Sequence, residues 1–306
     1  MGECSTAVSH WPIETGGQLN FTTTSDGKKV RYALWPDGTK GLVIFLNGRN
    51  EYIEKYNCAY SILQKKGFAV VALDWRGQGL SDRSEIRDNY GHVNSFEEFQ
   101  LDLQAVLSES SVKSICGRRI VLAHSTGGCI AHRAVKNEDL GIERAVFLAP
   151  LWGGFTIQKL MVFLGRAMSN VGLGKISSAP KTKSPYIFRT TIQKNIHTSD
   201  PVQFDRLQRI IATDSRLSIG PPTFSWLSSV GKEIEFLTKY PHLKIPHLVL
   251  IGSEDWLISI KEVKKIVNQN KLGIFEVIPN ARHELLIEKP FITELVWSKI
   301  GQFLEK

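Results

Sequence analysis

A serine, a histidine and an aspartate of this sequence stand where they could act together as a nucleophile, its base and a carboxylate that orients the base. The nucleophile candidate is Ser125, in the stretch RIVLAHSTGGCI over residues 119–130. Its apolar first half predicts a buried strand, and apolar residues recur at helical spacing after Gly128. A strand that turns into a helix within a few residues needs small neighbours and strains one backbone position. The pattern therefore places Ser125 on a sharp turn at a helix N-terminus, where free N–H groups favour a developing oxyanion.

This turn matches the pattern G-x-S-x-G with one departure, because Ala123 stands in place of the first glycine. That position requires a small residue more than an unusual backbone conformation, so alanine is a mild replacement. The alternative is a buried Ser-Thr-Gly-Gly turn that carries no chemistry. Partners elsewhere in the sequence must decide between the two.

A serine hydroxyl needs a base within hydrogen-bond reach and a carboxylate that fixes the tautomer of that base. Two late segments supply these groups. Asp255 follows a predicted strand over 247–252, and His283 follows another over 273–278. In open parallel sheets such loops meet at the C-terminal ends of the strands, and the chain order Ser, Asp, His is typical of a nucleophile on this kind of turn.

Other candidates for these two roles are weaker. Glu254 is adjacent to Asp255 and should point elsewhere, although Asp255 could also serve only to stabilise its loop. His124 stands beside the serine in sequence, so its side chain should point into the fold. Four further histidines occupy places that do not suit a base. His132 lies on the helix after the turn, His197 and His242 lie in or after the insertion described below, and His247 starts a strand. His283 is therefore the predicted base.

An oxyanion hole requires two backbone donors. The N–H of Thr126, directly after the nucleophile, is the first candidate. The second is the N–H of Arg49, in the loop after a predicted strand over 41–46, where Gly48 permits close approach. Many proteins with such a loop have histidine where Asn47 stands, and we expect this difference to affect support of the loop more than the donor.

The elements that must position these residues alternate between strands and helices. Residues 19–24 and 30–35 flank an Asp-Gly turn and predict an antiparallel hairpin. Continuous apolar runs predict buried strands at 41–46, 68–73, 119–123, 144–149, 247–252 and 273–278. Helical spacing predicts helices at about 52–66, 96–108, 259–268 and 291–304. This alternation favours an α/β fold with a mostly parallel sheet covered on both faces.

The alternation stops after Pro150. Residues 151–237 contain no convincing buried strand and predict helices at 156–168, 200–213 and 224–238. We expect a core of residues 1–150 and 238–306 and a helical cap, or lid, over 151–237. The first cap helix carries a broad apolar surface beside Lys159 and Arg166, which could meet an acyl chain or a membrane or could simply pack on the core. Its residues are Phe155, Ile157, Leu160, Met161, Val162, Phe163, Leu164 and Met168.

Composition narrows the function classes. The chain has 306 residues, 42% of them hydrophobic, with no evident secretory signal or membrane span. Its four cysteines are scattered without C-x-x-C spacing, which argues against a zinc site and a disulfide framework and favours a reducing cytoplasm. The net charge of +8 would suit an anionic partner such as a phospholipid surface or nucleic acid, but it is spread along the chain, so a solvated surface is favoured over a dedicated site for an anion. The G-x-G of DWRGQGLS, residues 74–81, lacks a third glycine and predicts a structural turn instead of a nucleotide loop.

Five stretches together resemble the bacterial lysophospholipase L2 and monoacylglycerol lipase group of α/β-hydrolases. They are NGRNE with the following EKY, LDWRGQGLS, HSTGG, GSED and ARHEL, at residues 47–56, 73–81, 124–128, 252–255 and 281–285. The stretches TSDP and GPPT of the insertion, at 198–201 and 220–223, are also similar to the lid of that group.

The resemblance implies an α/β-hydrolase fold and hydrolysis of a single acyl ester on a glycerol or glycerophospho backbone, without metal or organic cofactor. Ser125, His283 and Asp255 would form the triad, and the lid could bring the enzyme to the inner membrane. Relatives are also described as serine aminopeptidase-like, so a peptidase stays open, as do a carboxylesterase and a non-catalytic binding protein of the same fold. The motifs determine neither the physiological substrate nor the oligomeric state.

Overall fold

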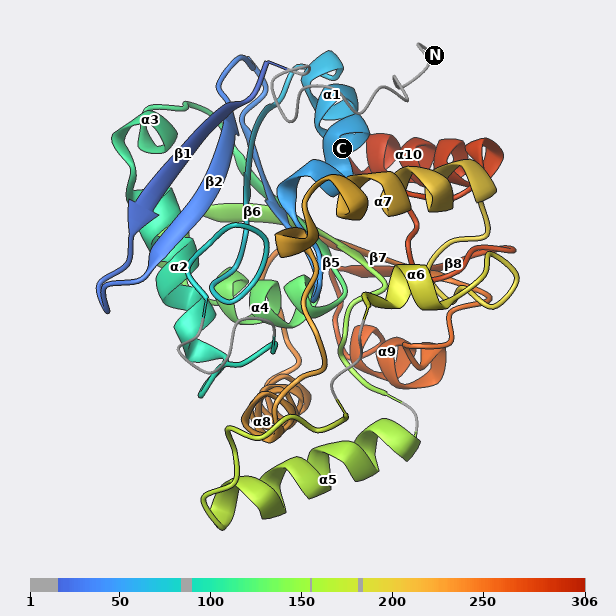
Figure 1. Ribbon diagram of the computed structural model, residues 1–306. Coiled ribbons are helices and arrows are strands. Elements are labelled where there is room, and N and C mark those ends of the chain that lie inside the picture. The colour runs from blue at the N-terminus through green and yellow to red at the C-terminus, as the bar shows by residue number, and fades with distance from the viewer. Residues whose placement is uncertain (1–15, 84–89, 155, 181–183, 306) are drawn as a thin grey trace.

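A single eight-stranded sheet forms the centre of the computed structural model (Figure 1), which describes residues 16–83, 90–154, 156–180 and 184–305, with only the backbone at 156 and 157. The strands are β1 (Gln18–Thr23), β2 (Lys29–Trp35), β3 (Leu42–Leu46), β4 (Ala69–Leu73), β5 (Arg119–His124), β6 (Ile142–Leu148), β7 (His247–Gly252) and β8 (Gly273–Ile278). Their order is β1-β2-β4-β3-β5-β6-β7-β8. Strand β2 pairs antiparallel with β1 and β4, and the strands from β3 to β8 pair in parallel. The predicted hairpin and mostly parallel sheet are confirmed.

Helices follow most of the parallel strands. They are α1 (Asn57–Lys65), α2 (Glu97–Ser108), α3 (Ser110–Lys113), α4 (Thr126–Val135), α5 (Thr156–Asn170), α6 (Tyr186–Arg189), α7 (Pro201–Thr213), α8 (Phe224–Lys239), α9 (Ile260–Val267) and α10 (Pro290–Glu305), with short 3-10 turns at Ile53–Tyr56, Glu138–Leu140 and Ser215–Leu217. The predicted helix over 52–66 is thus a 3-10 turn followed by α1. Helices α3 and α6 were not predicted, because four residues are too few to show a helical repeat.

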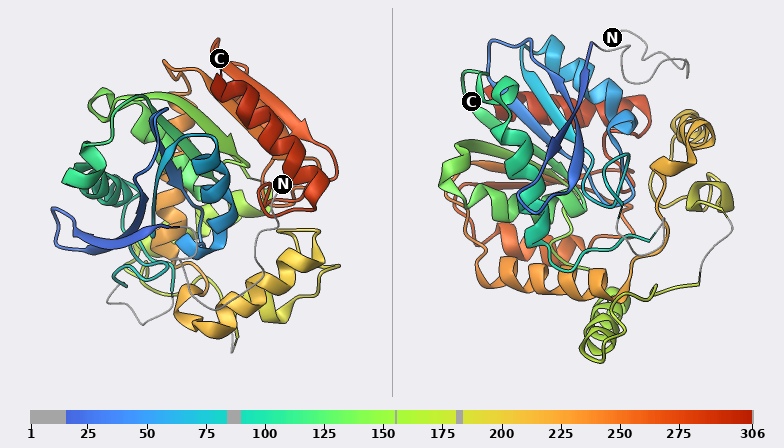
Figure 2. Two further views of the ribbon diagram at one scale, coloured as in Figure 1. Left: turned by 90° about the horizontal axis from the view of Figure 1, so that it is seen from above. Right: turned by 60° about the vertical axis from the view of Figure 1, so that its left-hand side comes forward.

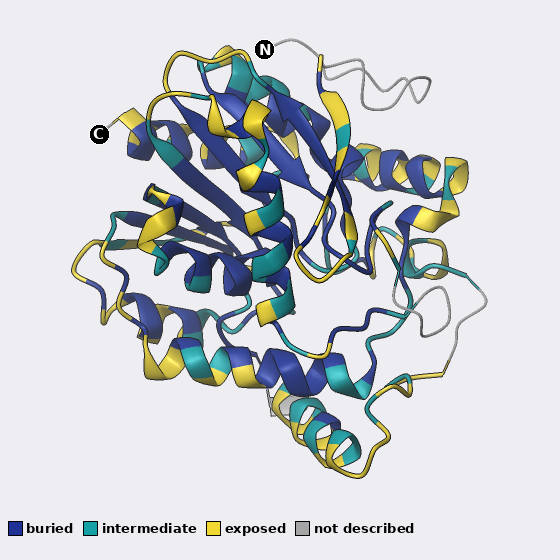
Figure 3. Ribbon diagram, turned by 90° about the vertical axis from the view of Figure 1, so that its left-hand side faces the viewer, coloured by how far each residue is buried: buried dark blue, intermediate teal, exposed yellow. Residues whose placement is uncertain are grey.

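Helices cover both faces of the central sheet (Figure 2), and the central strands are buried (Figure 3). Side chains of these strands alternate between two apolar layers, as a sheet buried on both faces requires. Ile44 and Leu46 of β3 face a core that includes residues of α2, α4, α8 and α9. Val43 and Phe45 face the opposite core, with residues of α1, α7 and α10. The strand sequences are therefore apolar throughout instead of alternating with polar residues.

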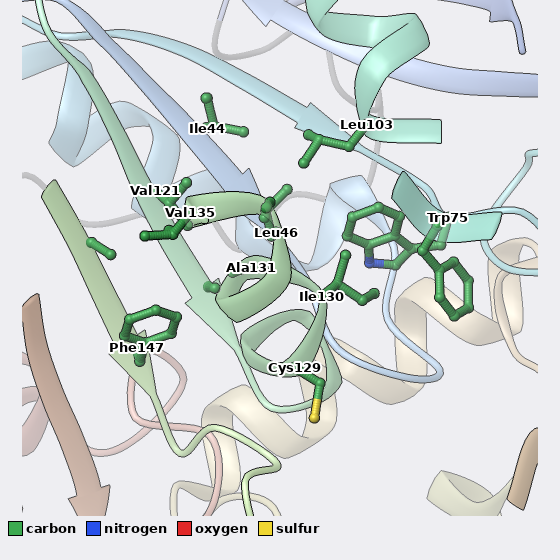
Figure 4. Packing of buried hydrophobic residues seen from close by; sticks show 14 of the residues in the cluster. Ile44, Leu46, Trp75, Leu103, Val121, Cys129, Ile130, Ala131, Val135 and Phe147 are labelled. Carbon is green, nitrogen blue, oxygen red and sulfur yellow. The ribbon is translucent and has the colours of Figure 1, made fainter. Parts of the chain in front are cut away.

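Helix α4 packs directly on the sheet (Figure 4), with Ile130, Ala131 and Val135 turned toward apolar side chains of the strands. Its first turn runs especially close to the end of β3. A Cβ atom placed on Gly127 would lie 2.3 Å from the carbonyl oxygen of Leu46 and 2.5 Å from that of Asn47. Only glycine fits there, because a backbone carbonyl cannot yield as a flexible side chain can.

The G-x-G segment is a structural turn, as predicted. Buried Asp74 accepts hydrogen bonds from the amides of Ile53 and Leu80 at 2.9 and 2.8 Å. It also accepts one from Nε of Arg31 at 2.7 Å. Asp74 thus holds the turn against β2 and the start of the 3-10 turn, so its role is structural.

The segment between β6 and β7 adds no strand to the sheet among its described residues and contains α5 to α8. Helix α5 lies at the outer end of the molecule and packs on α8 (Figures 1 and 2), where glycines bring the two backbones together. A Cβ atom on Gly165 would lie 2.7 Å from Cβ of Leu227, and one on Gly231 would lie 2.1 Å from Cγ1 of Val162. Phe155 and the side chain of Ile157, both predicted to face lipid or substrate, lie outside the described structure.

The cysteines correct one expectation. Cys58 is disulfide-bonded, so the inference that the cysteines form no disulfide framework is wrong at this position. Cys116 and Cys129 are free, and Cys4 lies outside the described residues. Because disulfides persist mainly in oxidising compartments, cysteine usage no longer supports the cytoplasmic assignment, which stays a prediction. In the part of the chain that the structure describes, no helix combines the length and apolarity needed to cross a membrane.

We expect Gly127→Ala to destabilise the protein by about 1–3 kcal/mol, because the added methyl group meets two carbonyl oxygens of the strand end. Urea unfolding followed by circular dichroism measures this. Gly301→Ala in α10 is the matched control, since the nearest atom to its added Cβ is the mobile Lys66 Nζ at 3.2 Å. That variant should be neutral or more stable by up to about 1 kcal/mol. Equal effects of the two substitutions would contradict the close approach of α4 to β3.

Candidate active site

Ser125 lies between β5 and α4 and has φ 51° and ψ −118°, a strained conformation for a residue with a side chain. Its amide donates to the carbonyl of Leu148 at 3.0 Å, which fixes the turn to β6. Small residues on either side permit this geometry. Gly127 passes β3, and a Cβ on Gly128 would lie 2.6 Å from Cβ of Pro150. The predicted strand, turn and helix are confirmed.

The structure brings Ser125, His283 and Asp255 into one hydrogen-bonded row. Nε2 of His283 lies 3.0 Å from Oγ of Ser125, and Nδ1 of His283 lies 2.8 Å from Oδ2 of Asp255. The other carboxylate oxygen of Asp255 accepts from the amides of Leu257 and Ile258 at 2.8 and 2.9 Å. The loop after β7 therefore holds the carboxylate rigidly behind the imidazole.

Electrostatics keep Asp255 ionised. Burial alone would raise its pKa, but the charge of His283 and the hydrogen bonds from His283, Leu257 and Ile258 outweigh burial and lower the pKa. An ionised carboxylate can fix the tautomer of the imidazole and stabilise the imidazolium. The neighbouring Glu254 is exposed and its amide, not its side chain, joins the loop structure.

The loop after β3 lies beside the serine. A Cβ atom on Gly48 would lie 3.0 Å from Cβ of Ser125, so the loop approaches as closely as glycine allows. Among the described residues, the amides of Arg49 and Thr126 donate no hydrogen bond within the protein. Both predicted oxyanion donors therefore belong to segments that meet at Ser125 and keep free N–H groups there.

Support of this loop comes from residues that the sequence did not single out. Nε1 of Trp75 donates to the carbonyl of Asn47 at 2.9 Å, and the amide of Gly48 donates to the carboxylate of Glu51. The side-chain amide of Asn47 is buried and has no hydrogen-bond partner among the described residues. The loop is thus held through its backbone, and the side chain at position 47 contributes little to its support.

A buried group of charged residues lies beneath the row, and sequence reasoning missed it. Nζ of Lys55 lies 2.9 Å from Oε1 of Glu51 and 2.5 Å from Oε1 of Glu284. Nδ1 of His124 lies 2.9 Å from Oε1 of Glu51, and Tyr56 donates from its hydroxyl to Oε2 of Glu284 at 2.9 Å. We call these five residues the charged network. Its only sequence signals were the i, i+4 spacing of Glu51 and Lys55 and the position of Glu284 directly after the predicted base.

The charged network balances its own charge. Burial alone would lower the pKa of His124, but the charges of Glu51 and Glu284 raise it to about 9, so its imidazole is protonated at neutral pH. Burial likewise opposes ionisation of Glu51, but the charges of His124 and Lys55 hold its pKa well below the usual range. Three of these side chains are close enough together to hold a metal ion. Two cations already neutralise the two carboxylates, however, so this site does not need a metal.

The charged network also contacts the segment that carries His283. Nε2 of His124 lies 3.2 Å from the carbonyl oxygen of His283, and the amide of Glu284 donates to the carbonyl of His197 at 2.8 Å. His124 therefore turns away from the reacting groups, as predicted, but it supports the histidine loop. His197, set aside in the sequence because it lies in the insertion, has its ring centroid 6.0 Å from that of His283. His132 and His247 bond to backbone carbonyls of Pro241 and Ile245.

A cavity of about 860 Å³ opens at Ser125 and His283. Its wall consists of the loop after β3 and residues of the insertion, and this wall is mostly apolar. Large side chains in this wall include Trp152, Met161, Val162, Trp226, Leu227 and Val230. Such a lining suits a long apolar group whose polar end reaches Ser125.

A mostly parallel sheet with a strained serine after its fifth strand, and with histidine and aspartate on later loops, defines an enzyme of the α/β-hydrolase class. The chain belongs to the family described as "Serine aminopeptidase, S33", which matches residues 37–290. The resemblance inferred from the sequence motifs is thereby confirmed.

Several relatives share most of the chain's length. It is 27% identical over 276 residues to "Probable lysophospholipase L2" of Haemophilus influenzae, covering 90% of this chain and 87% of that protein. It is 25% identical over 280 residues to "Lysophospholipase L2" of Escherichia coli K12, covering 87% and 80%. A soluble variant of monoglyceride lipase from Saccharomyces cerevisiae, solved with a substrate analog, superposes with a TM-score of 0.75 at 16% identity, covering 97% and 98%. At that identity the last likeness shows the fold alone.

The charged network predicts a pH-dependent stability. The pKa of His124 is raised from its ordinary 6.5 to about 9, so the stability it contributes is fully present below pH 6.5 and is lost as the pH rises through about 9. We expect the free energy of unfolding to fall by a few kcal/mol across this range, measured by urea unfolding at several pH values.

His124→Asn should flatten this pH dependence, whereas His242→Asn at an exposed histidine should keep that of the wild type. A His124→Asn protein whose stability falls as steeply as the wild type between pH 6.5 and about 9 would contradict the protonated state of His124.

Proposed function

We propose that this protein is a serine hydrolase that cleaves a carboxylic ester of a monoacyl lipid, a lysophospholipid or a monoacylglycerol, through an acyl-enzyme. The observation that carries the proposal is the row of Ser125, His283 and Asp255 at the end of a mostly apolar cavity. The name of the two bacterial relatives, lysophospholipase L2, supports a monoacyl lipid substrate.

The mechanism assigns each group one role. His283 takes the proton of Ser125 as Oγ attacks the ester carbonyl carbon, and Asp255 stabilises the imidazolium. The amides of Arg49 and Thr126 bind the oxyanion. The alcohol then leaves with the proton from His283, and the acyl group stays on Ser125. Water, deprotonated by His283, attacks this second ester, and the fatty acid departs as Ser125 regains its proton.

The charges in the cavity favour an ester over an aminopeptidase substrate. A free amino terminus would need an unneutralised carboxylate near the serine. Among the described lining residues, the glutamates already pair with cations, since Glu51 and Glu284 contact Lys55. The two others, Glu235 and Glu262, pair with Arg166 and Lys159. A small-molecule carboxylesterase would use the same row, but it would leave most of the apolar cavity unused.

The proposal extends to residues 151–237 as a lid over the core formed by 1–150 and 238–306. Helix α5 supplies Met161, Val162 and Phe163 to the cavity and turns Leu160 and Leu164 outward, with exposed fractions of 53% and 40%. Exposed apolar residues beside Lys159 and Arg166 suit the surface of an anionic membrane. We infer that α5 makes a peripheral contact with such a surface, from which a monoacyl lipid enters.

Ser125→Ala should abolish labelling by a fluorophosphonate and hydrolysis of a p-nitrophenyl ester while the protein stays folded, because the nucleophile is lost. Asp255→Asn should lower kcat by about 10⁴, since the imidazole then adopts the wrong tautomer. The exposed neighbour variant Glu254→Gln is the matched control and should stay within a few-fold of the wild type. Labelling that survives Ser125→Ala would end the hydrolase proposal. A panel of monoacylglycerol, lysophospholipid and aminoacyl-nitroanilide then identifies the substrate class.

Leu160→Asp should weaken co-sedimentation with anionic phospholipid vesicles by about tenfold, because an exposed apolar anchor is replaced by a charge that the surface repels. Val202→Asp on α7, where the exposed fraction is 55%, is the matched control and should bind as the wild type does. Equal binding of both variants would argue against membrane contact through α5.

A further inference from the structure

Arg49 places a guanidinium group at the wall of the cavity. It lines the cavity together with Ser125 and Trp226. Its guanidinium carbon lies 5.3 Å from the centroid of the Trp226 ring, and Nη2 donates to the carbonyl of Gly220. A Cβ atom on Gly91 would lie 2.7 Å from Nη2, so the glycine leaves room for the group. These contacts hold the guanidinium in one place.

These contacts do not neutralise its charge. Within the described part of the chain, no carboxylate lies at ion-pair distance from Arg49, and its buried Nε has no hydrogen-bond partner. The other partly or fully buried cations of the cavity wall, Lys55 and Arg166, each contact a glutamate. Burial lowers the pKa of Arg49 to about 10, so it still carries its charge at neutral pH. A buried cation without a counter-charge is unfavourable unless a ligand supplies one.

We propose that the Arg49 guanidinium binds the headgroup phosphate of a monoacyl glycerophospholipid and makes the enzyme prefer such a lipid to a neutral monoacylglycerol. This inference rests on the proposed ester hydrolysis at Ser125. The amide of Arg49 is the proposed oxyanion donor, so the ester carbonyl and the phosphate would meet the two ends of one residue. The short glycerol backbone that joins ester and phosphate suits this separation.

The chemistry of the group fits a phosphate better than another anion of the substrate. Guanidinium presents parallel N–H donors that match two phosphate oxygens, and the apolar wall strengthens the attraction by excluding water. Trp226 and the carbonyl of Gly220 occupy one face and one edge of Arg49. Among the described residues, Nε has no hydrogen-bond partner and the side chain donates only through Nη2.

The test compares kcat/KM for a lysophosphatidylglycerol and for a monoacylglycerol with the same acyl chain. In Arg49→Met the ratio of the two values should fall at least about tenfold, because the phosphate loses its counter-charge while methionine keeps the backbone N–H at position 49. Arg49→Lys should give an intermediate ratio, since it keeps the charge and loses the planar fork. The ratio is the readout because a disturbed oxyanion loop slows both substrates alike.

The control variant is Arg206→Met, which removes a buried arginine that donates to the carbonyl of Lys55 and does not line the cavity. Its ratio should stay within about twofold of the wild type. An unchanged ratio in Arg49→Met, or an equal fall in Arg206→Met, would overturn the assignment. A wild-type protein that hydrolyses neither lipid would instead refute the proposed function itself, and the phosphate site with it.

Inorganic phosphate separates a headgroup site from a site for free phosphate. Under the proposal it competes with the lysophosphatidylglycerol and leaves monoacylglycerol turnover unchanged, and Arg49→Met removes the competition. Inhibition of both substrates to the same extent would mean that Arg49 recognises a free anion that blocks the cavity, which would overturn the headgroup assignment.

Discussion

The contact between Lys55 and the two carboxylates of Glu51 and Glu284 is the interaction on which the rest of the site depends. Lys55 and Glu284 are separated by 229 positions in the sequence, and their side chains meet at 2.5 Å in the interior. Glu51 holds the amide of Gly48, and Glu284 directly follows His283. One buried ammonium group thus connects the loop after β3 to the loop that carries His283. Because removing one partner would leave a charge unpaired in a low dielectric, the geometry of both loops is tied to the stability of the fold.

Features that depend on local sequence could be predicted. Ser125 was found because small residues must surround a strained turn, and the central strands were found because burial on both faces makes them apolar throughout. Asp255 and His283 followed from their places after late strands, since parallel strands end at one edge of a sheet. The structure brings these three side chains together.

Features that depend on contacts between distant parts of the chain could not be predicted from the sequence. In the sequence, Glu51 and Lys55 look like an ordinary i, i+4 pair on a helix surface, and only the fold shows that both are buried. His197 was set aside because the insertion has no strand pattern to place it, yet it lies beside His283. The disulfide of Cys58 was missed because the spacing of the cysteines alone reveals no pairing. In each case the partner lies in a segment whose position no local pattern determines.

The packing of α5 determines how easily this helix separates from the rest of the molecule. This helix packs chiefly on α8 through a seam of glycines, and it meets the apolar core of the sheet through the partly buried Met161 and Val162. Elements with few buried apolar contacts separate at a smaller free energy than the whole domain unfolds. Helix α5 can therefore detach as a cooperative unit of its own. Amide hydrogens of α5 would then exchange with solvent long before those of the parallel strands. The cavity beside Ser125 would widen without any change in the sheet.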